Sequence, residues 1–250
     1  MEGPSLVLAR EQLAPFTGKE VLAVAGNTKV GKEVLLGKQV REIFSWGKHL
    51  VFQFDTVAMR VHFMLFGTFQ AEVEGAWVTG DYRRKAQTPR LVLEFANGRI
   101  EMYSCSVKFF EDPSLKSSYD FSTDVLAPEW DPGAAYKKIM RQPDERIDDI
   151  LLDQEIFAGV GNIIKNEILF LARVRPERTV RELTPKKRRE LIALARSFSR
   201  QFYEWRKVFL LKKNLVIYRK PVCPVSGTKV VRAKTGKRQR WSFWCPVCQK

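Results

Sequence analysis

A Gly159-Val160-Gly161-Asn162 turn, inside the apolar segment of residues 151–167, is the feature that most constrains how this chain folds. Glycine adopts backbone conformations that are closed to other residues, so the turn predicts a sharp break between two helices. We place Asn162 at the N-cap of the second helix. The first amides of a helix have no partner inside it and carry the positive end of its dipole, which predicts a phosphate-binding site. A turn that only joins two packed helices is the alternative.

The positive charge of the chain is concentrated in its C-terminal third. The 250 residues carry a net charge of +15, and residues 173–250 hold 23 of the 43 Lys and Arg residues but only 4 of the 28 Asp and Glu residues. This excess predicts a polyanionic partner, with nucleic acid as the first candidate, and an affinity that falls as salt is added. A solvated basic face is the alternative.

The cysteines and the apolar runs indicate the compartment. Cys105 is isolated, whereas Cys223, Cys245 and Cys248 cluster near the end of the sequence, which is not the pattern of a disulfide framework. No apolar run is long enough to span a membrane, and the first residues lack the pattern of a signal peptide. We therefore expect a soluble, cytoplasmic protein with no membrane partner.

Hydrophobic patterns predict an α+β protein whose first part is rich in strands. A helix is predicted over residues 3–14, and seven short strands follow it. They cover residues 20–24, 38–44, 50–54, 59–62, 68–73, 90–95 and 100–103. Turn signals such as Asn97-Gly98 separate the strands, so residues 1–118 are predicted to form a β-sandwich. Residues 119–134 mix Pro, Asp, Gly and Ser without periodicity and predict a linker.

The second part of the chain is predicted to be helical and to end in a small β-hairpin module. Apolar residues recur at helical spacing in five segments. These are residues 135–141, 146–152, 156–158, 162–172 and 185–211. Thr184 followed by Pro185 is a start signal for the last helix. The helical domain then covers residues 135–218, and residues 219–250 return to short β-like segments framed by cysteines.

Three motifs in this order resemble the formamidopyrimidine-DNA glycosylase and endonuclease VIII family. They are Met1-Glu2-Gly3-Pro4, the GKHLVF segment of residues 47–52, and the turn around Asn162. The resemblance covers nearly the whole chain. It implies a β-sandwich, a helix, two-turn, helix domain and a C-terminal β-hairpin zinc finger. It also implies a monomer without an organic cofactor that excises oxidised bases from DNA and then cuts the backbone, as a glycosylase with abasic-site lyase activity.

The start of the sequence departs from the family pattern. Members begin Pro-Glu-Gly-Pro, and their terminal amine attacks the sugar carbon C1′ to form a Schiff base. Here Met1 replaces the proline, so the resemblance implies the amine of Met1 as nucleophile and Glu2 as the carboxylate that relays protons to the sugar. Lys48 matches a lysine that contacts the phosphate near the lesion. Ser5 stands where bacterial relatives usually carry a second glutamate. A chain that has lost catalysis is the alternative.

The resemblance also implies contacts to DNA at His62, Asn162, Lys165 and Arg240. Asn162 matches an asparagine that holds a phosphate next to the lesion, and Arg240 matches a finger arginine that grips flanking phosphates. Lys165 is either a phosphate contact or a solvent-exposed lysine. Glu167, further along the same helix, is expected to pack or pair rather than to catalyse.

Removal of a base from a duplex requires that the base leaves the stack, and the resulting void is filled by flat or apolar side chains. Met64, Leu65 and Phe66 match the family's void-filling residues. They follow a predicted strand and precede Gly67, so we expect them to be exposed, with a place in the core as the alternative.

The finger has an incomplete set of metal ligands. Cys245 and Cys248 form one half of a zinc ribbon, but Cys223 is followed by Ser226 where the family has a fourth cysteine. Structural zinc nearly always takes four Cys or His ligands. The sequence therefore leaves two alternatives for the finger: a zinc site, or a metal-free hairpin held by apolar side chains.

The segment between Leu211 and Tyr218 bears on the substrate. It lacks the long loop that covers 8-oxoguanine in the purine-specific members, which implies oxidised pyrimidines or hydantoins as substrates, in duplex DNA and in single strands too. A non-catalytic protein that binds damaged DNA with the same fold is the alternative. An RNA-binding ribbon protein is a third reading.

Overall fold

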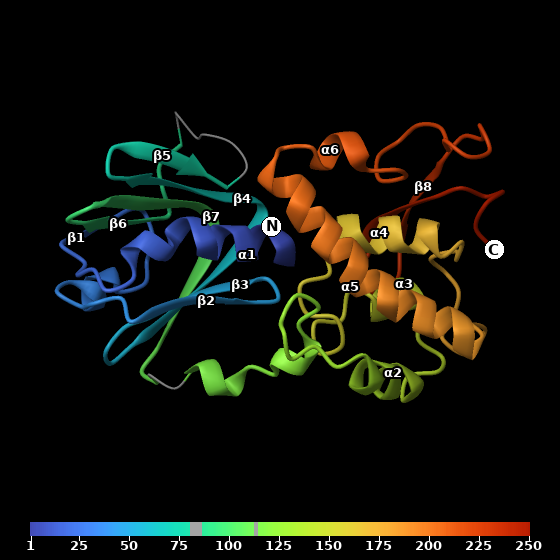
Figure 1. Cartoon of the computed structure of the whole chain (residues 1–250), viewed down its shortest axis with the longest axis horizontal. Helices are drawn as coiled ribbons and strands as arrows, with labels where there is room; N and C mark the ends of the chain where they lie inside the picture. The colour runs from blue at the N-terminus through green and yellow to red at the C-terminus, as the bar shows by residue number, and fades with distance from the viewer. Residues whose placement is uncertain (81–86, 113–114) are drawn as a thin grey trace. The chain divides into compact units, whose positions relative to one another are not determined.

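A computed structural model describes residues 1–80, 87–112 and 115–250 (Figure 1). The chain divides into two compact units. The first consists of Met1 and residues 5–119, and the second consists of residues 2–4 and 120–250. Within the described residues, no helix is both long and apolar enough to cross a bilayer.

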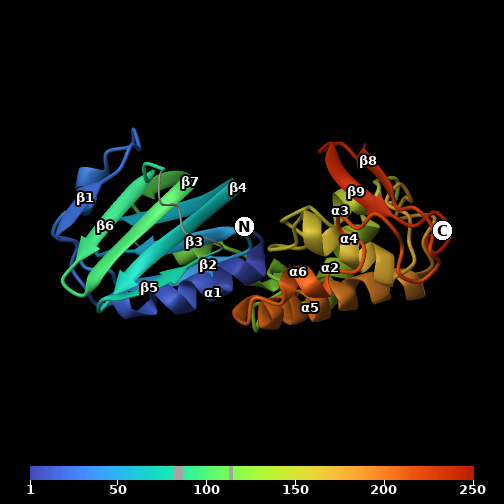
Figure 2. The ribbon, with the colours of Figure 1, turned by 90° about the horizontal axis from the view of Figure 1, so that it is seen from above.

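The first unit combines helix α1 (Gly3–Leu13) with an antiparallel sheet that has seven strands within the described residues (Figures 1 and 2). The strands are β1 (Ala23–Ala25), β2 (Glu42–Trp46), β3 (His49–Gln53), β4 (Ala58–Val73), β5 (Ala76–Thr79), β6 (Leu91–Phe95) and β7 (Gly98–Phe110). Their order is β1-β6-β7-β4-β3-β2, and β5 pairs with β4. The unit also contains three 3₁₀ turns: η1 (Ala14–Phe16) after α1, η2 (Lys32–Leu35) between β1 and β2, and η3 (Leu115–Ser118) after β7.

The long strands β4 and β7 belong to both layers of a β-sandwich. Their pairing shifts register between Phe63 and Thr68 of β4, where β4 carries a bulge. Strand β3 pairs with β4 before the bulge and β5 pairs with it after the bulge. A bulge bends the strand and increases its twist, so the two ends of β4 can serve two layers. Leu6 of α1, Phe52 of β3 and Phe69 of β4 are all buried in one core.

The β-sandwich and the N-terminal helix predicted from the sequence are confirmed. The strands predicted over residues 59–62 and 68–73 are one strand, β4, because the bulge interrupts the apolar alternation without ending the strand. The strand predicted over residues 20–24 is wrong in its bounds, since only its end lies in β1 and Glu20 forms an isolated bridge with Gln39. Strand β5 was not predicted.

The second unit is helical and ends in the hairpin β8-β9. Its elements are η4 (Phe121–Thr123), α2 (Pro132–Met140), α3 (Ile147–Ile150), α4 (Asn162–Leu171), α5 (Pro185–Lys207), α6 (Leu211–Asn214), β8 (Val231–Thr235) and β9 (Arg240–Trp244). Helix α2 begins where the Asp131 carboxylate accepts the amides of Gly133 and Ala134, and α5 begins where the Thr184 hydroxyl accepts the amide of Lys187. The start signal at Thr184 is confirmed.

Three segments of this unit differ from the prediction. Residues 120–134, expected to lie in a linker, pack into the unit, with Val125 and Trp130 in its core. The short helix predicted over residues 156–158 is wrong, because these residues form turns and Ala158 makes a parallel bridge with Asp124. Helix α5 stops at Lys207, before the predicted end, since the next turn contains a left-handed residue, Phe209, with a φ of 60°.

The buried carboxylate of Glu167 fixes the chain between α6 and the hairpin. It accepts backbone amides from Val216 at 2.8 Å, Ile217 at 3.0 Å and Tyr218 at 2.7 Å. Glu167 is fully buried, and burial raises the pKa of its carboxyl while the three amides oppose that rise. The expectation that Glu167 packs rather than catalyses agrees with this arrangement.

We predict that Glu167→Gln destabilises the chain by about 2 to 3 kcal/mol, because one of the two acceptor oxygens is replaced by a donor that faces buried amides. Urea unfolding followed by circular dichroism measures this. The matched control is Glu129→Gln, at an exposed position, with an expected change below about 0.5 kcal/mol. Equal effects of the two substitutions would contradict the role of Glu167.

Candidate functional site

The carboxylate of Glu2 occupies the N-terminus of helix α4. Its two oxygens accept hydrogen bonds from the backbone amides of Ile163 at 2.7 Å and Ile164 at 3.2 Å. Negative charge is favourable at this end of a helix. The amides that the sequence predicted as a phosphate site are therefore bound to a carboxylate of the chain itself, and that part of the prediction is wrong.

The glycines of the turn before α4 make room for residues 2 and 3. A Cβ on Gly161 would lie 2.3 Å from Cδ of Glu2, so a side chain there would displace the carboxylate. The amide of Gly3 donates to the carbonyl of Gly159 at 2.9 Å, and Gly159 has a left-handed φ of 97°. The Gly-Val-Gly turn thus provides the space in which Glu2 binds to α4.

Asn162 and Asn166 of helix α4 hold strand β9. Asn162 is the first residue of the helix and Gly161 is its N-cap, so the predicted capping role of Asn162 is wrong. Its Nδ2 instead donates to the carbonyl of Trp241 at 2.9 Å. Asn166 donates to the same carbonyl at 3.2 Å and accepts the amide of Phe243 at 2.7 Å. Asn166 was not predicted as a site residue, because in the sequence it is an ordinary polar position on a helix.

Lys165 is buried and does not face solvent. It is fully inaccessible, and its Nζ donates to Oγ of Ser242 at 2.8 Å. Burial lowers the pKa of Lys165 to about 8, with Arg240 acting in the same direction and Asp148 against it. The expectation of a solvent-exposed lysine or a surface phosphate contact is wrong, because this ammonium group is used to hold the hairpin.

Helix α3 holds the tip of the same hairpin. The carboxylate of Asp149 accepts the backbone amides of Lys237 at 2.8 Å and Arg238 at 3.4 Å, and Asp148 accepts the hydroxyl of Thr235. Arg240 is exposed at the start of β9, between these two attachments. Its backbone is therefore positioned from α3 and α4 while its guanidinium is accessible.

In the first unit, Met1, Lys48 and His62 form a second group of predicted site residues. Lys48 lies in the two-residue turn between β2 and β3, and its carbonyl is 3.1 Å from Nδ1 of His62. Burial lowers the pKa of His62, the Lys48 carbonyl opposes this, and the charge of the Met1 amine lowers the pKa further. The charge of the Met1 amine thus acts on the imidazole of His62 within the first unit.

His49 packs behind this group and was not predicted as a site residue. Its ring lies 5.6 Å from that of His62, 5.7 Å from that of Trp46 and 5.9 Å from that of Tyr119, measured between centroids. Burial lowers the pKa of His49 to about 4, so the imidazole is neutral at physiological pH. It contributes packing rather than charge.

Met64, Leu65 and Phe66 are exposed, as expected, with 52%, 70% and 66% of their surface accessible. They lie in the β4 bulge rather than in a loop. Phe66 has a left-handed φ of 64°, and a Cβ on Gly67 would lie 2.6 Å from the carbonyl oxygen of Ser104. The bulge therefore presents three apolar side chains on a fixed backbone.

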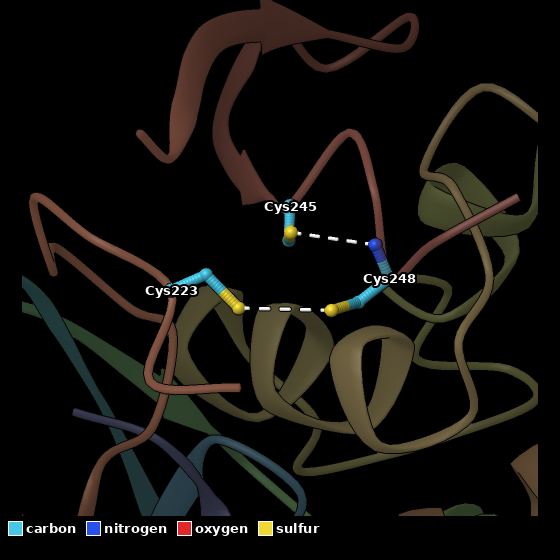
Figure 3. A group of neighbouring side chains, drawn as sticks. All are labelled: Cys223, Cys245 and Cys248. Atoms are coloured by element: carbon cyan, nitrogen blue, oxygen red, sulfur yellow. Dashed lines mark hydrogen bonds between the residues drawn. The ribbon is translucent and has the colours of Figure 1, made fainter. Parts of the chain in front are cut away.

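Cys223, Cys245 and Cys248 form a cluster that could bind a metal such as zinc (Figure 3). Their sulfur atoms lie within 4.8 Å of one another, and Ser226 Oγ is 3.2 Å from Sγ of Cys245. Burial raises the pKa of Cys245, but hydrogen bonds from Ser226 and from the backbone amide of Cys248 act against this and bring it to about 6. A thiolate is the form of cysteine that ligates zinc, so the donor set fits, with Ser226 beside the three sulfurs.

Comparison with known proteins agrees with this geometry. Residues 122–200 match the model of the formamidopyrimidine-DNA glycosylase H2TH domain. Endonuclease 8-like 3 of Mus musculus is 30% identical over 207 residues, which cover 82% of this chain and 33% of the relative. A DNA-(apurinic or apyrimidinic site) lyase, Nei2, of Mycolicibacterium smegmatis is 28% identical, with 86% of this chain and 84% of the relative covered.

The fold is shared with solved structures over its full length. The formamidopyrimidine-DNA glycosylase of Lactococcus lactis, solved bound to DNA that contains an abasic site, superposes with a TM-score of 0.83 at 20% identity, and all of both chains is covered. The chain spans only about a third of the length of the endonuclease 8-like 3 relatives. With its β-sandwich, its H2TH domain and its cysteine-containing hairpin, the chain belongs to the formamidopyrimidine-DNA glycosylase and endonuclease VIII family of DNA glycosylases.

Proposed function

We propose that this chain is a base-excision-repair glycosylase that removes oxidised bases from DNA and then cleaves the strand as an abasic-site lyase. The observation that carries the proposal is the binding of the Glu2 carboxylate to the N-terminus of α4. The residue that directly follows Met1 has its carboxylate fixed by two amides of α4, and the absence of a side chain on Gly161 leaves room for that carboxylate. A protein that only bound DNA would have no need for a fixed carboxylate on the residue that follows Met1.

The reaction begins with the amine of Met1 as nucleophile. The neutral nitrogen attacks C1′ of the damaged nucleotide, the glycosidic bond breaks, and the base leaves with the bonding electrons and a proton. Loss of the amine's proton and opening of the sugar ring give an iminium ion, the Schiff base. Proton loss from C2′ then expels the 3′ phosphate, and water hydrolyses the iminium to release Met1. An α-amino group suits this role because its reference pKa of about 8 leaves a neutral fraction at pH 7.

Glu2 carries the protons in these steps, to and from the sugar ring oxygen. Hydrogen bonds from Ile163 and Ile164 set the direction of the carboxylate, which is what a proton carrier requires. In the first unit, Lys48 supplies the positive charge for the phosphate of the damaged nucleotide, and His62 holds the turn that carries Lys48 through the contact between its Nδ1 and the Lys48 carbonyl.

Contacts to DNA come from exposed groups on both units. The exposed guanidinium of Arg240 binds a phosphate beside the lesion, and Asn162 supports it by holding the backbone of β9, through the hydrogen bond from its Nδ2 to the Trp241 carbonyl. The exposed apolar side chains of Met64, Leu65 and Phe66 fill the void that the extruded base leaves.

Zinc in the cysteine cluster has a structural role in this proposal. Cys223, Cys245 and Cys248 would hold the ion as thiolates, and the hydroxyl of Ser226, beside Cys245, would be the fourth ligand. Bound zinc supplies a cross-link between the base of the hairpin and the segment that precedes it. The three residues hold Arg240's hairpin and take no part in the chemistry at the sugar.

We predict that Glu2→Gln slows base excision at least about a hundredfold, because the amide accepts the α4 hydrogen bonds only in part and carries no proton. Release of thymine glycol from a labelled duplex measures the rate.

Borohydride reduction on abasic DNA tests the nucleophile. It should trap a covalent adduct at Met1, and addition of one residue before Met1 should abolish nicking. Absence of an adduct, or an adduct at an internal lysine, would overturn the role of Met1 and favour a damage-binding protein without catalysis.

Substrate preference follows from the short segment between α5 and the hairpin. Residues 208–218 contain α6 and end in the three amides held by Glu167, so no long loop is available to cover a purine. We predict faster release of thymine glycol and hydantoins than of 8-oxoguanine opposite cytosine, measured on matched duplexes under single-turnover conditions. Faster release of 8-oxoguanine would show that this preference is wrong.

We predict that Ser226→Cys raises the affinity for zinc at least about tenfold, because a thiolate is a stronger zinc ligand than a hydroxyl. Competition with a chromophoric chelator measures the affinity, and elemental analysis gives the stoichiometry. Ser197→Cys, a new thiol on exposed helix surface, is the control and should leave zinc affinity unchanged. Failure of both wild type and Ser226→Cys to bind zinc would mean that the hairpin is metal-free.

A further inference from the structure

A groove of about 1070 Å³ lies between α2 and α5 of the second unit, and nothing in the proposed reaction uses it. Its walls come from the segment before α2, from α2 itself and from one face of α5. The residues that hold Glu2 and Arg240 lie on α3, α4 and β9 and contribute nothing to its lining. The groove is therefore a separate feature of this unit.

The floor of the groove is apolar. Trp130 and Ile192 form it and are themselves almost buried, at 8% and 3% accessible surface. Ala193 and Ser197, which are exposed and one turn apart on α5, keep the floor open because their side chains are small. A concave apolar floor of this size accommodates a large apolar side chain.

Positive charges surround this floor. Lys137 of α2 and Arg189, Arg196 and Arg200 of α5 line the groove, against one acid, Glu204. Within the described residues none of these four cations forms an ion pair. The ion pairs nearby are made by other lysines, namely Lys138, Lys187 and Lys207.

Two of the cations are already fixed in place. The Arg189 guanidinium lies over the Tyr136 ring at 5.3 Å, and Arg196 donates to the carbonyls of Val125 at 3.4 Å and Ala127 at 3.0 Å. An arginine held in this way loses little freedom when it binds a carboxylate, so the groove is prepared for anionic groups.

We propose that this groove binds an acidic peptide segment of a partner protein, in which an aromatic or aliphatic side chain is flanked by Asp or Glu. The apolar residue enters the floor over Trp130 and Ile192, and the flanking carboxylates pair with Arg189 and Arg200. DNA fits less well, because its phosphates would use the cations and leave the apolar floor without a partner.

Selection of peptides against the full chain tests the proposal. A phage library of random peptides about 12 residues long is selected on the immobilised protein and counter-selected on the variant Arg189→Glu/Arg200→Glu. We expect the surviving peptides to share one apolar residue between acidic ones. Synthetic, fluorescein-labelled copies then give affinities by anisotropy, with a short duplex containing a tetrahydrofuran abasic analogue as competitor.

We expect the labelled peptides to lose affinity at least about tenfold on Arg189→Glu/Arg200→Glu, which reverses the charge, and on Ala193→Trp, which fills the floor. The control Lys186→Glu/Lys213→Glu changes the net charge equally at exposed helix positions outside the groove and should shift affinity less than about twofold. Nicking of abasic DNA should be unchanged in both groove variants, and the abasic duplex should not displace the peptide.

Several results would overturn the proposal. Selection that yields no peptides, peptides without acidic residues, or binding that the groove variants do not weaken would each exclude an acidic-peptide site. Loss of affinity for the abasic duplex in the groove variants would instead identify a DNA-binding surface. Peptide binding does not require lyase activity, so this test and the tests of the proposed reaction fail independently.

Discussion

Helix α4 organises the second unit because its first turn binds Glu2 through the backbone and its side chains bind the hairpin. The amides of Ile163 and Ile164 take the carboxylate of Glu2, while Asn162, Lys165 and Asn166 reach Trp241, Ser242 and Phe243. Backbone amides at a helix N-terminus must find an acceptor, and here an acceptor from the same chain supplies it. One rigid element therefore sets both the direction of Glu2 and the backbone that carries Arg240, which is what a site made of distant sequence segments requires.

Sequence patterns were sufficient for the elements and the family, and insufficient for buried polar contacts. The apolar spacing identified α4 and α5, and the Gly-Val-Gly turn was correctly placed before α4. Nothing in the sequence distinguished Lys165, which is buried against Ser242, from an exposed lysine. The same limit applies to the amides of α4, because the sequence shows that they need an acceptor but not that Glu2, 161 positions away, supplies it. Contacts between distant segments depend on tertiary packing, which local propensity does not encode.

The exposed apolar triplet of residues 64–66 shows how a short sequence can be both exposed and held by its neighbours. Met64, Leu65 and Phe66 lie in a bulge that β7 pairs on both sides, so their backbone is held at its ends while the side chains face outward. Gly67 is needed because a Cβ there would collide with the Ser104 carbonyl. Exposure of three apolar side chains to water is unfavourable. An exposed apolar patch of this kind usually marks a surface that contacts a partner. In the proposed function that partner is a stacked duplex with one base extruded, which offers a flat apolar surface.

The occupied amides of α4 also restrict how this chain can bind phosphate. A DNA phosphate cannot use the amides of Ile163 and Ile164 without displacing Glu2, because both amides already donate to its carboxylate. In the proposed function, phosphates are therefore bound by cationic side chains, with Arg240 and Lys48 as the candidates. Binding through cationic side chains releases counterions, so affinity should depend steeply on salt. The geometry of Glu2, in contrast, depends on neutral amides and is insensitive to salt, which separates the strength of DNA binding from the chemistry at the sugar.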